Sequence, residues 1–216
     1  MSSAACAGGA GAAAGALAVG SGLAYRGAAA DGTLEFWGIT DRGPNGDTPS
    51  APVPGSSTNA VTKMFPAPSF APTIGVITLG RTGANITATL PLKIDASAKA
   101  TGRPLPAGAV GASGEVPLTD RLIYDATRAP FDTQGLDPES LVHDPARQAF
   151  WASDEYGPFI VRIDASSGVI QKRYAPGDAP GSLPAVLKHR RANRGMEGLA
   201  LDPETGHLHG FLQSPI

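Results

Sequence analysis

Glu139-Ser140-Leu141-Val142 and Glu197-Gly198-Leu199-Ala200 are two copies of one four-residue element, and Ser21-Gly22-Leu23-Ala24 is a third. In chain order, the second and third copies start 58 residues apart. The first and second start 118 residues apart, about twice that distance, so a degenerate copy is expected between them. Self-similarity at a fixed period is typical of repeat architectures. The chain is therefore expected to build several similar units from one motif.

Each copy continues in the same way, with a turn followed by a strand. The turns are Asp31-Gly32, Asp144-Pro145 and Asp202-Pro203, and the strands that follow are 36–40, 150–153 and 209–212, ending in Asp41, Asp154 and Gln213. A period near 58 residues suits a four-stranded propeller blade with long loops, since propeller repeats run to about 40–50 residues or more. Such blades pack radially around a central channel. A solenoid is the alternative, but hairpin-like copies and long loops favour blades.

The rest of the chain consists of short apolar runs separated by turns. Strands are expected at 16–19, 34–39, 74–79, 86–92, 149–153, 159–163, 169–174 and 208–212. Two stretches rich in Pro, Ser and Gly, 46–59 and 100–115, are expected to form long surface loops. One helical turn is predicted at 183–188, after Ser182. Many short strands with almost no helix predict an all-β, β-propeller-like fold with long Gly/Pro-rich loops.

The blade count predicts an incomplete propeller. Residues 1–19 form a low-complexity Ala/Gly leader, and residues 20–216 form the propeller domain. From Ser21 to Ile216 the chain holds about three and a half units of the repeat, whereas closed propellers have at least about four blades. The domain is therefore expected to be a truncated, N-terminal portion with an incomplete set of blades. Open blade edges would favour self-association, because unpaired strand edges bind other strands.

Composition and charge exclude several classes of partner. The formal net charge of −2 gives no basic surface for nucleic acid, so no nucleic-acid partner is expected. No run approaches the ~18 apolar residues of a membrane span. The leader lacks a basic segment, so it is not a convincing export signal and the compartment stays open. Cys6 is the single cysteine, with no partner for a disulfide and no Arg-containing phosphate loop around it.

Acidic residues recur at the repeat period. Glu139 and Glu197 occupy one repeat position, and Asp41 and Asp154 occupy another. Equivalent positions of successive blades lie at one height around the channel, so these acids are expected to form a ring. Neighbouring carboxylates repel one another and favour a cation, and Ca²⁺ binds six to eight oxygen ligands. We therefore predict a calcium site at these four residues. The alternative is that the acids are hydrogen-bonded residues that lock the blades together.

A cluster of cations precedes the third copy of the element. The stretch 188–195 contains Arg190, Arg191 and Arg194, and Arg42 directly follows a repeat acid. Guanidinium groups match phosphate oxygens with two parallel hydrogen bonds. These four arginines are therefore predicted to bind phosphate, because they adjoin the acids of the predicted ring. The alternative is a solvated charged surface.

Other catalytic classes lack their motifs. The chain has no Gly-x-Ser-x-Gly elbow of a serine esterase, no P-loop and no dinucleotide fingerprint. The Arg-His-Gly-x-Arg-x-Pro element of histidine phytases is also absent. His207 and His209 could share one strand face, but no further His or Cys lies near them to complete a transition-metal site.

The motifs together resemble the phytase-like, or esterase-like, domain family. The stretches that carry the likeness are 21–25, Thr40-Asp41-Arg42-Gly43-Pro44-Asn45, 135–139, Asp154-Glu155-Tyr156-Gly157-Pro158-Phe159 within 150–159, 193–199 and Gln213-Ser214-Pro215. The likeness runs from about residue 20 to 216, interrupted by the loops at 46–59 and 100–115. The resemblance implies a propeller-type fold, often in exported proteins, with Asp and Glu residues that hydrolyse phosphoesters. The family domain usually continues beyond the Gln-Ser-Pro element.

Two functional hypotheses follow. The first is a metal-dependent phosphoester hydrolase that acts on a phosphorylated small molecule, with Glu139, Asp154, Glu155 and Glu197 as ligands or bases and the arginines holding phosphate. The second is a non-catalytic propeller that binds a partner or an anionic ligand, because a fold does not fix a function. Turnover of a chromogenic phosphate ester that is lost with a chelator distinguishes the two.

Overall fold

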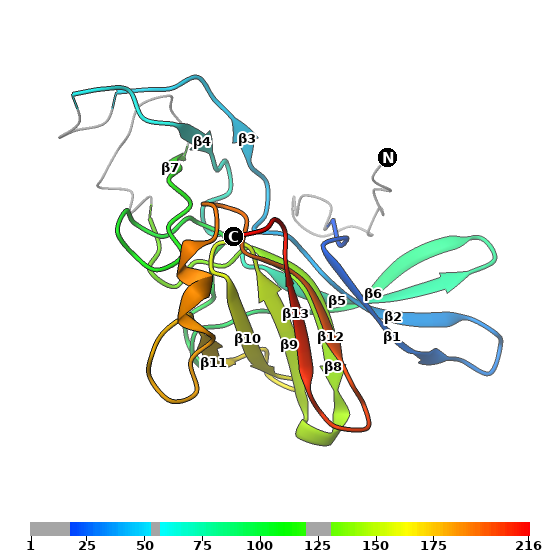
Figure 1. Ribbon diagram of the computed structural model, residues 1–216. Helices are drawn as coiled ribbons and strands as arrows, with labels where there is room; N and C mark the ends of the chain where they lie inside the picture. Colours follow the sequence, from blue (N-terminus) through cyan, green and yellow to red (C-terminus); the bar gives the residue numbers. More distant parts are fainter. Residues whose placement is uncertain (1–17, 53–56, 120–130) are drawn as a thin grey trace.

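The computed structural model describes residues 18–52, 57–119 and 131–216, and within them the chain is all-β (Figure 1). Its strands are β1 (Gly22–Ala28), β2 (Leu34–Ile39), β3 (Gly46–Asp47), β4 (Thr62–Met64), β5 (Thr73–Gly80), β6 (Gly83–Pro91), β7 (Val116–Leu118), β8 (Pro138–Asp144), β9 (Ala149–Asp154), β10 (Phe159–Asp164), β11 (Ile170–Tyr174), β12 (Met196–Leu201) and β13 (Leu208–Leu212). Two short 3-10 helices, η2 (Pro145–Arg147) and η3 (Ala185–His189), complete the described elements. Cys6 and most of the leader lie outside the described residues.

The first sheet has four antiparallel strands in the order β1-β2-β5-β6. Strand β5 begins with four buried residues and ends with two exposed ones, so the sheet is covered at one end and projects into solvent at the other. The projecting hairpins are visible at the right of Figure 1. This sheet brings Asp41, the second residue after β2, to the covered end.

The second sheet has the order β8-β9-β10-β11, with each strand antiparallel to the next one along the chain. Every residue of β9 is buried, because neighbouring structure covers both faces of the sheet. Side-chain carboxylates fix the turns: Asp144 accepts from the backbone N–H of Arg147 at the start of η2, and Asp164 accepts from Ser166 and Ser167. Asp and Ser favour such turns because their short side chains bond to the backbone nearby.

Two smaller sheets complete the structure. Strands β12 and β13 form an antiparallel hairpin, and β3, β4 and β7 form a three-stranded sheet in which β4 and β7 are parallel. The expected helical turn at 183–188 corresponds to η3.

Two apolar cores cover the two faces of the β8–β11 sheet. The larger contains Ile39, Ile74 and Phe150, which join this sheet to the first one. The smaller contains Trp151, Ile160, Met196 and Leu199, which join it to the β12–β13 hairpin. Three sheets are therefore stacked face to face, with the second sheet in the middle. Burying both faces of the middle sheet is the main source of stability in this arrangement.

The three copies of the sequence repeat form β1, β8 and β12, and each continues through its turn into β2, β9 or β13. Strand β8 lies beside both β1 and β12. The approach to β1 is close, since a Cβ atom on Gly22 would lie 2.5 Å from the backbone N of Leu141. On the other side, Ser140 Oγ accepts a hydrogen bond from the N–H of Leu199. The repeat thus identifies the strands along which successive sheets meet.

The prediction of a degenerate fourth copy of the repeat between residues 21 and 139 is wrong as far as the described residues are concerned. Strand β8 lies directly beside β1, with no further four-stranded sheet between them. The extra length consists of β3, β4, β7 and loops, which are inserted within and after the first sheet. A doubled spacing therefore reflects an insertion instead of a missing repeat.

The prediction of an all-β fold is confirmed. Seven of the eight expected strands correspond to β2, β5, β6, β9, β10, β11 and β13, and the eighth, 16–19, lies partly outside the described residues. The described residues do not close into a ring. Among them, no helix is long and apolar enough to cross a membrane.

Candidate functional site

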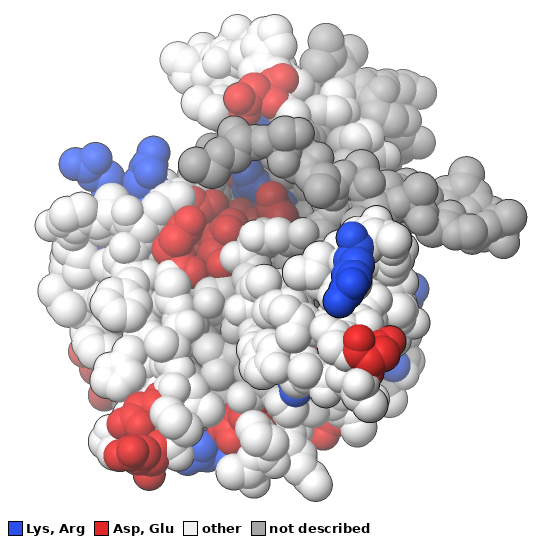
Figure 2. All heavy atoms as spheres, turned by 90° about the vertical axis from the view of Figure 1, so that its right-hand side faces the viewer, with Lys and Arg blue, Asp and Glu red and all other residues white. Residues whose placement is uncertain are grey.

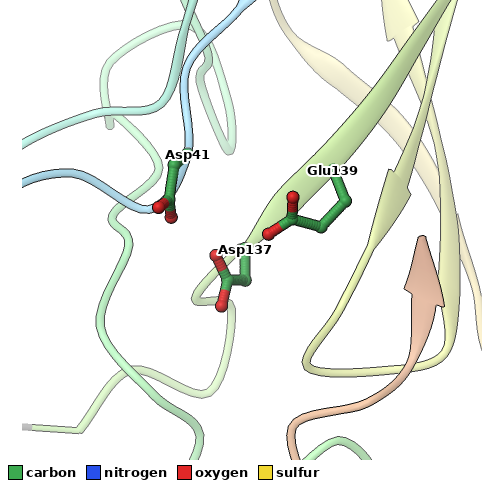
Figure 3. A group of neighbouring side chains, drawn as sticks. All are labelled: Asp41, Asp137 and Glu139. Carbon is green, nitrogen blue, oxygen red and sulfur yellow. The ribbon is translucent and has the colours of Figure 1, made fainter. Parts of the chain in front are cut away.

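Three carboxylates meet where the first two sheets adjoin. Asp41 follows β2, Asp137 immediately precedes β8, and Glu139 is in β8. One oxygen atom from each lies within 4.8 Å of the others. Figure 3 shows the three side chains converging from two segments, the loop after β2 and the start of β8 with the residue before it. We refer to Asp41, Asp137 and Glu139 as the acidic cluster.

A series of backbone hydrogen bonds holds the strand ends around the cluster. The N–H of Glu155 donates to the carbonyl of Asp137 (2.8 Å), and the N–H of Gly195 donates to the carbonyl of Glu155 (2.9 Å). The N–H of Gln213 then donates to the carbonyl of Gly195 (3.0 Å). Gly195 is required here, because a Cβ atom would collide with the carbonyl of Glu155. The start of β8, the end of β9 and the start of β12 are thereby fixed side by side.

Asp137 is the most buried member of the cluster, with 1% of its surface exposed. Neither of its carboxylate oxygens accepts a hydrogen bond from a described residue, although Oδ2 lies 3.2 Å from Nη1 of Arg42. Burial raises the pKa of Asp137 well above its usual range, and Asp41 and Glu139 add to this increase, while Arg42 opposes it. A buried carboxylate without a donor is unfavourable unless a proton or a cation neutralises it.

Further acids surround the cluster. Burial raises the pKa of Glu139 to about 8, and the charges of Asp41, Glu197 and Glu155 contribute. Burial also raises the pKa of Glu155, and the charge of Glu197 adds to this effect. One carboxylate oxygen of Glu197 is buried with no hydrogen-bond donor among the described residues. Figure 2 shows acidic side chains gathered in a hollow of the displayed face. The region therefore carries an excess of negative charge.

Arg42 is the buried cation beside this group. Its guanidinium is 6% exposed, and Nη1 lies 3.0 Å from Glu115 Oε2 and 3.3 Å from the hydroxyl of Tyr156, in addition to its contact with Asp137. These neighbours raise the pKa of Arg42 despite its burial. Arg42 thus neutralises part of the acidic charge from inside the protein.

The donor set fits a hard divalent cation. All three ligating groups are carboxylates, which are the ligands that Ca²⁺ and Mg²⁺ prefer, and the set contains no Cys or His. One carboxylate oxygen of Asp137 lies within 4.8 Å of an oxygen of each of the other two carboxylates (Figure 3). His207 and His209 do not take part in any such group among the described residues.

Asp154 differs from the repeat-equivalent Asp41. Its Oδ2 accepts from the N–H of Asp137 (3.0 Å), and its Oδ1 accepts from the N–H of Gly157 (3.1 Å). Burial raises the pKa of Asp154 to about 6, while these backbone donors lower it. The carboxylate of Asp154 therefore holds the start of β8 and the turn after β9 in place, beside the cluster.

The predicted phosphate-binding arginines have different environments. Nη2 of Arg190 donates to the carbonyls of Tyr156 (2.6 Å) and Ala112 (3.2 Å), and Arg194 donates to the side chain of Gln213 (3.0 Å). Arg191 is exposed, and its side chain makes no hydrogen bond or ion pair with the described residues, although its backbone carbonyl accepts from the N–H of Arg194 (3.2 Å). Asn193 lies between Arg191 and Arg194 in the sequence, and its amide donates to Glu155 Oε2 (3.1 Å). This hydrogen bond links the basic stretch to the acids.

The structure thus brings together all five predicted acids, with Asp154 held by backbone donors beside the other four, and it places Arg42 next to them: the acids are Asp41, Glu139, Asp154, Glu155 and Glu197. Sequence reasoning missed Asp137, because the equivalent residues two positions before the other repeats are Val19 and Gly195. Its spacing from Glu139 was the available signal, since residues two apart in an extended segment face the same side.

Comparisons with known proteins place the chain in a family. Neither the curated proteins nor the solved structures gave a match. The family model described as "Phytase-like: Esterase-like activity of phytase" matches residues 17–216, which is nearly the whole chain. On the strength of this match, the chain belongs to the phytase-like family.

Proposed function

We propose that this protein is a metal-assisted phosphoester hydrolase whose centre is the acidic cluster. The observation that carries the proposal is the buried carboxylate of Asp137, which accepts no hydrogen bond, is ion-paired only with Arg42 among the described residues, and adjoins Asp41 and Glu139. Family membership supports a hydrolase. Carboxylates repel an anionic ester, so hydrolysis beside this many of them needs a cation that neutralises their charge. A metal at the acidic cluster would therefore serve the hydrolase activity that family membership supports.

The proposed architecture is propeller-like. Three stacked sheets, with β1, β8 and β12 as the strands along which they meet, match the arrangement of successive blades. The first two sheets have four strands each, and the third has two. In this architecture the acidic cluster lies at one end of the innermost strands, where propellers commonly place their sites.

Calcium is the proposed cation, held by Asp41, Asp137 and Glu139. When bound, it would supply positive charge that polarises a phosphoryl oxygen and offsets the negative charge of the substrate. Arg42 would hold Asp137 in a fixed orientation from the buried side, because it contacts that carboxylate at 3.2 Å.

The remaining acids would handle the proton. Glu197 has a buried carboxylate oxygen without a donor, so it can accept a proton from the attacking water. The water oxygen forms a bond to phosphorus while the phosphorus–oxygen bond of the ester breaks. The departing alkoxide takes the proton that Glu197 accepted, so Glu197 returns to its carboxylate form and the products are inorganic phosphate and an alcohol. Arg191, which is exposed and unpaired among the described residues, and Arg194 would contact the phosphate.

A second candidate function, binding without catalysis, is favoured by a different observation. The side chains of Arg42, Arg190 and Arg194 already have hydrogen-bond partners within the protein, so three of the four predicted phosphate-binding cations are at least partly occupied. Few arginines are then free to bind a substrate phosphate. A site that binds a cation but offers few free arginines is expected of a structural metal site or of a surface that binds a partner. Activity measurements decide between the two functions.

The test is phosphate release from 4-nitrophenyl phosphate with calcium, and with a chelator in excess. Hydrolysis that disappears with the chelator is expected. Glu197→Gln should lower kcat by about 10²–10⁴-fold, the usual contribution of a general base. Glu204→Gln, an exposed acid in the β12–β13 turn, is the matched control and should retain wild-type activity. No release with any divalent cation would favour binding without catalysis.

A further inference from the structure

A cavity of about 440 Å³ opens beside the acidic cluster, and Asp41 contributes to both. Its other walls include Pro44, Ala67 and Phe70, which are apolar. This volume lies within the roughly 300–1,000 Å³ range of small-molecule sites. The cavity therefore adjoins the proposed reaction centre, but its walls are mostly apolar, whereas the centre is made of carboxylates.

Both neutral polar side chains of the remaining wall already make a hydrogen bond within the protein. Thr40 is 1% exposed, and its Oγ1 accepts a hydrogen bond from the N–H of Thr73 at 3.0 Å. The amide of Asn45 donates to the carbonyl of Gly43 at 2.9 Å. Asp41 is then the one charged side chain among the lining residues. A ligand in this cavity would be recognised mainly through apolar contact.

The aromatic wall is held in place by the backbone. Gly43 has a φ of +100°, and a Cβ atom there would collide with the ring of Phe70. Phe70 is also fixed by a tight turn, in which its N–H donates to the carbonyl of Ala67 at 2.9 Å. The ring thus rests directly on the backbone of the segment that carries Asp41. The cavity is formed before any ligand binds.

We infer that this cavity binds the apolar, preferably aromatic, alcohol portion of the phosphoester whose phosphate lies at the acidic cluster. The inference rests on the proposed function, and it specifies the substrate class. A polyol carrying several phosphates would place anions against apolar walls and the carboxylate of Asp41, which is unfavourable. Aryl phosphomonoesters should therefore be hydrolysed in preference to phosphates of polar polyols.

The test compares two esters and one non-reacting probe on the full chain. Ala67→Phe fills the cavity, and Phe70→Ala removes its aromatic wall. Each should lower kcat/KM for 4-nitrophenyl phosphate by about tenfold, the lower range for an apolar pocket contact, and for glycerol 2-phosphate by less than about twofold. Each should weaken the binding of 4-nitrophenol, measured by equilibrium dialysis, by about tenfold.

The matched control is Ala30→Phe, an exposed alanine in the β1–β2 turn, at the opposite end of β2 from Asp41. It should change none of these values, and calorimetric calcium binding should be unchanged in all three variants. Equal losses for both esters, or unaltered 4-nitrophenol binding in both cavity variants, would overturn the inference. If neither ester is cleaved, the proposed function fails, but the 4-nitrophenol measurement still decides whether the cavity is an apolar site.

Discussion

At the scale of single residues, Asp137 determines the character of the site. Its carboxylate is 1% exposed, accepts no hydrogen bond and lies beside two further acids, so its charge destabilises the folded state unless cations or a proton neutralise it. Arg42 compensates for only part of this charge, because it is shared with Glu115 and Tyr156. The stability of the folded protein therefore depends on whether a proton or a cation is bound among the three carboxylates.

The first prediction is a calcium-dependent stability that Asp137 controls. A ligand present at 100 times its Kd stabilises by about 2.7 kcal/mol, which corresponds to a rise in Tm of about 5–10 °C for a chain of this size. Asp137→Asn should abolish most of this rise, because it removes a charged ligand at nearly constant shape. Asp178→Asn, at a carboxylate that is 85% exposed, is the control. A wild-type melting curve that is the same in millimolar calcium and in chelator would contradict the metal site.

The second prediction concerns pH in the absence of a cation. The pKa of Glu139 rises from 4.5 to about 8, so between these values the folded protein holds a proton that the unfolded chain has released. Stability must then fall as pH rises through this range. In chelator, the Tm of the wild type should decrease from pH 5 to pH 8, and Glu139→Gln should decrease less.

The control for the pH experiment is Glu204→Gln, which should follow the wild type. Calcium requires the deprotonated carboxylates, so its effect on Tm should be larger at pH 8 than at pH 5. Parallel pH curves for Glu139→Gln and the wild type would show that this group does not titrate in the predicted range.

The sequence could identify most of the acids but could not rank them. The repeat selected Glu139 and Glu197 because both lie at the start of equivalent strands, β8 and β12, of adjoining sheets. It also made Asp41 and Asp154 equivalent, although only the oxygens of Asp154 are bound by two backbone N–H groups. Repeat position fixes where a side chain lies, whereas its hydrogen-bond partners come from loops that do not repeat.

At the scale of elements, the contact between β1 and β8 sets how closely the first two sheets approach. Gly22 lies against the backbone of Ser140 and Leu141, with no room for a side chain. The third prediction is that Gly22→Ala destabilises the protein by about 1–3 kcal/mol, as overpacking does, with a fall in Tm of about 2–4 °C per kcal/mol. Thermal melting measures this directly.

Gly20→Ala is the matched control, because a Cβ atom there would meet nothing within 4 Å. It should leave Tm within about 1 °C of the wild type, given that surface changes usually alter stability by at most about 0.5 kcal/mol. Equal effects at the two glycines would mean that β1 and β8 do not pack this closely in solution.

Elements with a strong apolar pattern were predictable, and elements defined by distant partners were not. Strands β9 and β10 are runs of buried residues, so their sequence alone indicates them. Strands β3, β4 and β7 have two or three residues each and exist because they pair with one another across long loops. The same insertion doubled the first repeat spacing and led to the expectation of an additional copy.

At the scale of the whole molecule, the sheets differ in how their edges are protected. The β8–β11 sheet is covered on both faces, whereas β13 pairs only with β12 among the described strands. Along β13 the residues 209–211 are exposed, and Phe211 is exposed at 62%. A strand with an unpaired edge and an exposed aromatic side chain can pair with another chain.

The fourth prediction is that the chain self-associates through β13. The reason is that pairing of this edge would satisfy its free backbone groups and cover Phe211 at the same time. Size-exclusion chromatography with light scattering should show species larger than the 21.8 kDa monomer, and their share should increase with concentration. Phe211→Lys should shift the population toward monomer, because a charged side chain on an edge strand opposes pairing.

Val61→Lys, which replaces a side chain that is 65% exposed and lies outside the strands, should leave the distribution unchanged. A wild-type protein that is monomeric at all concentrations and melts cooperatively would show that the β13 edge is not a contact surface.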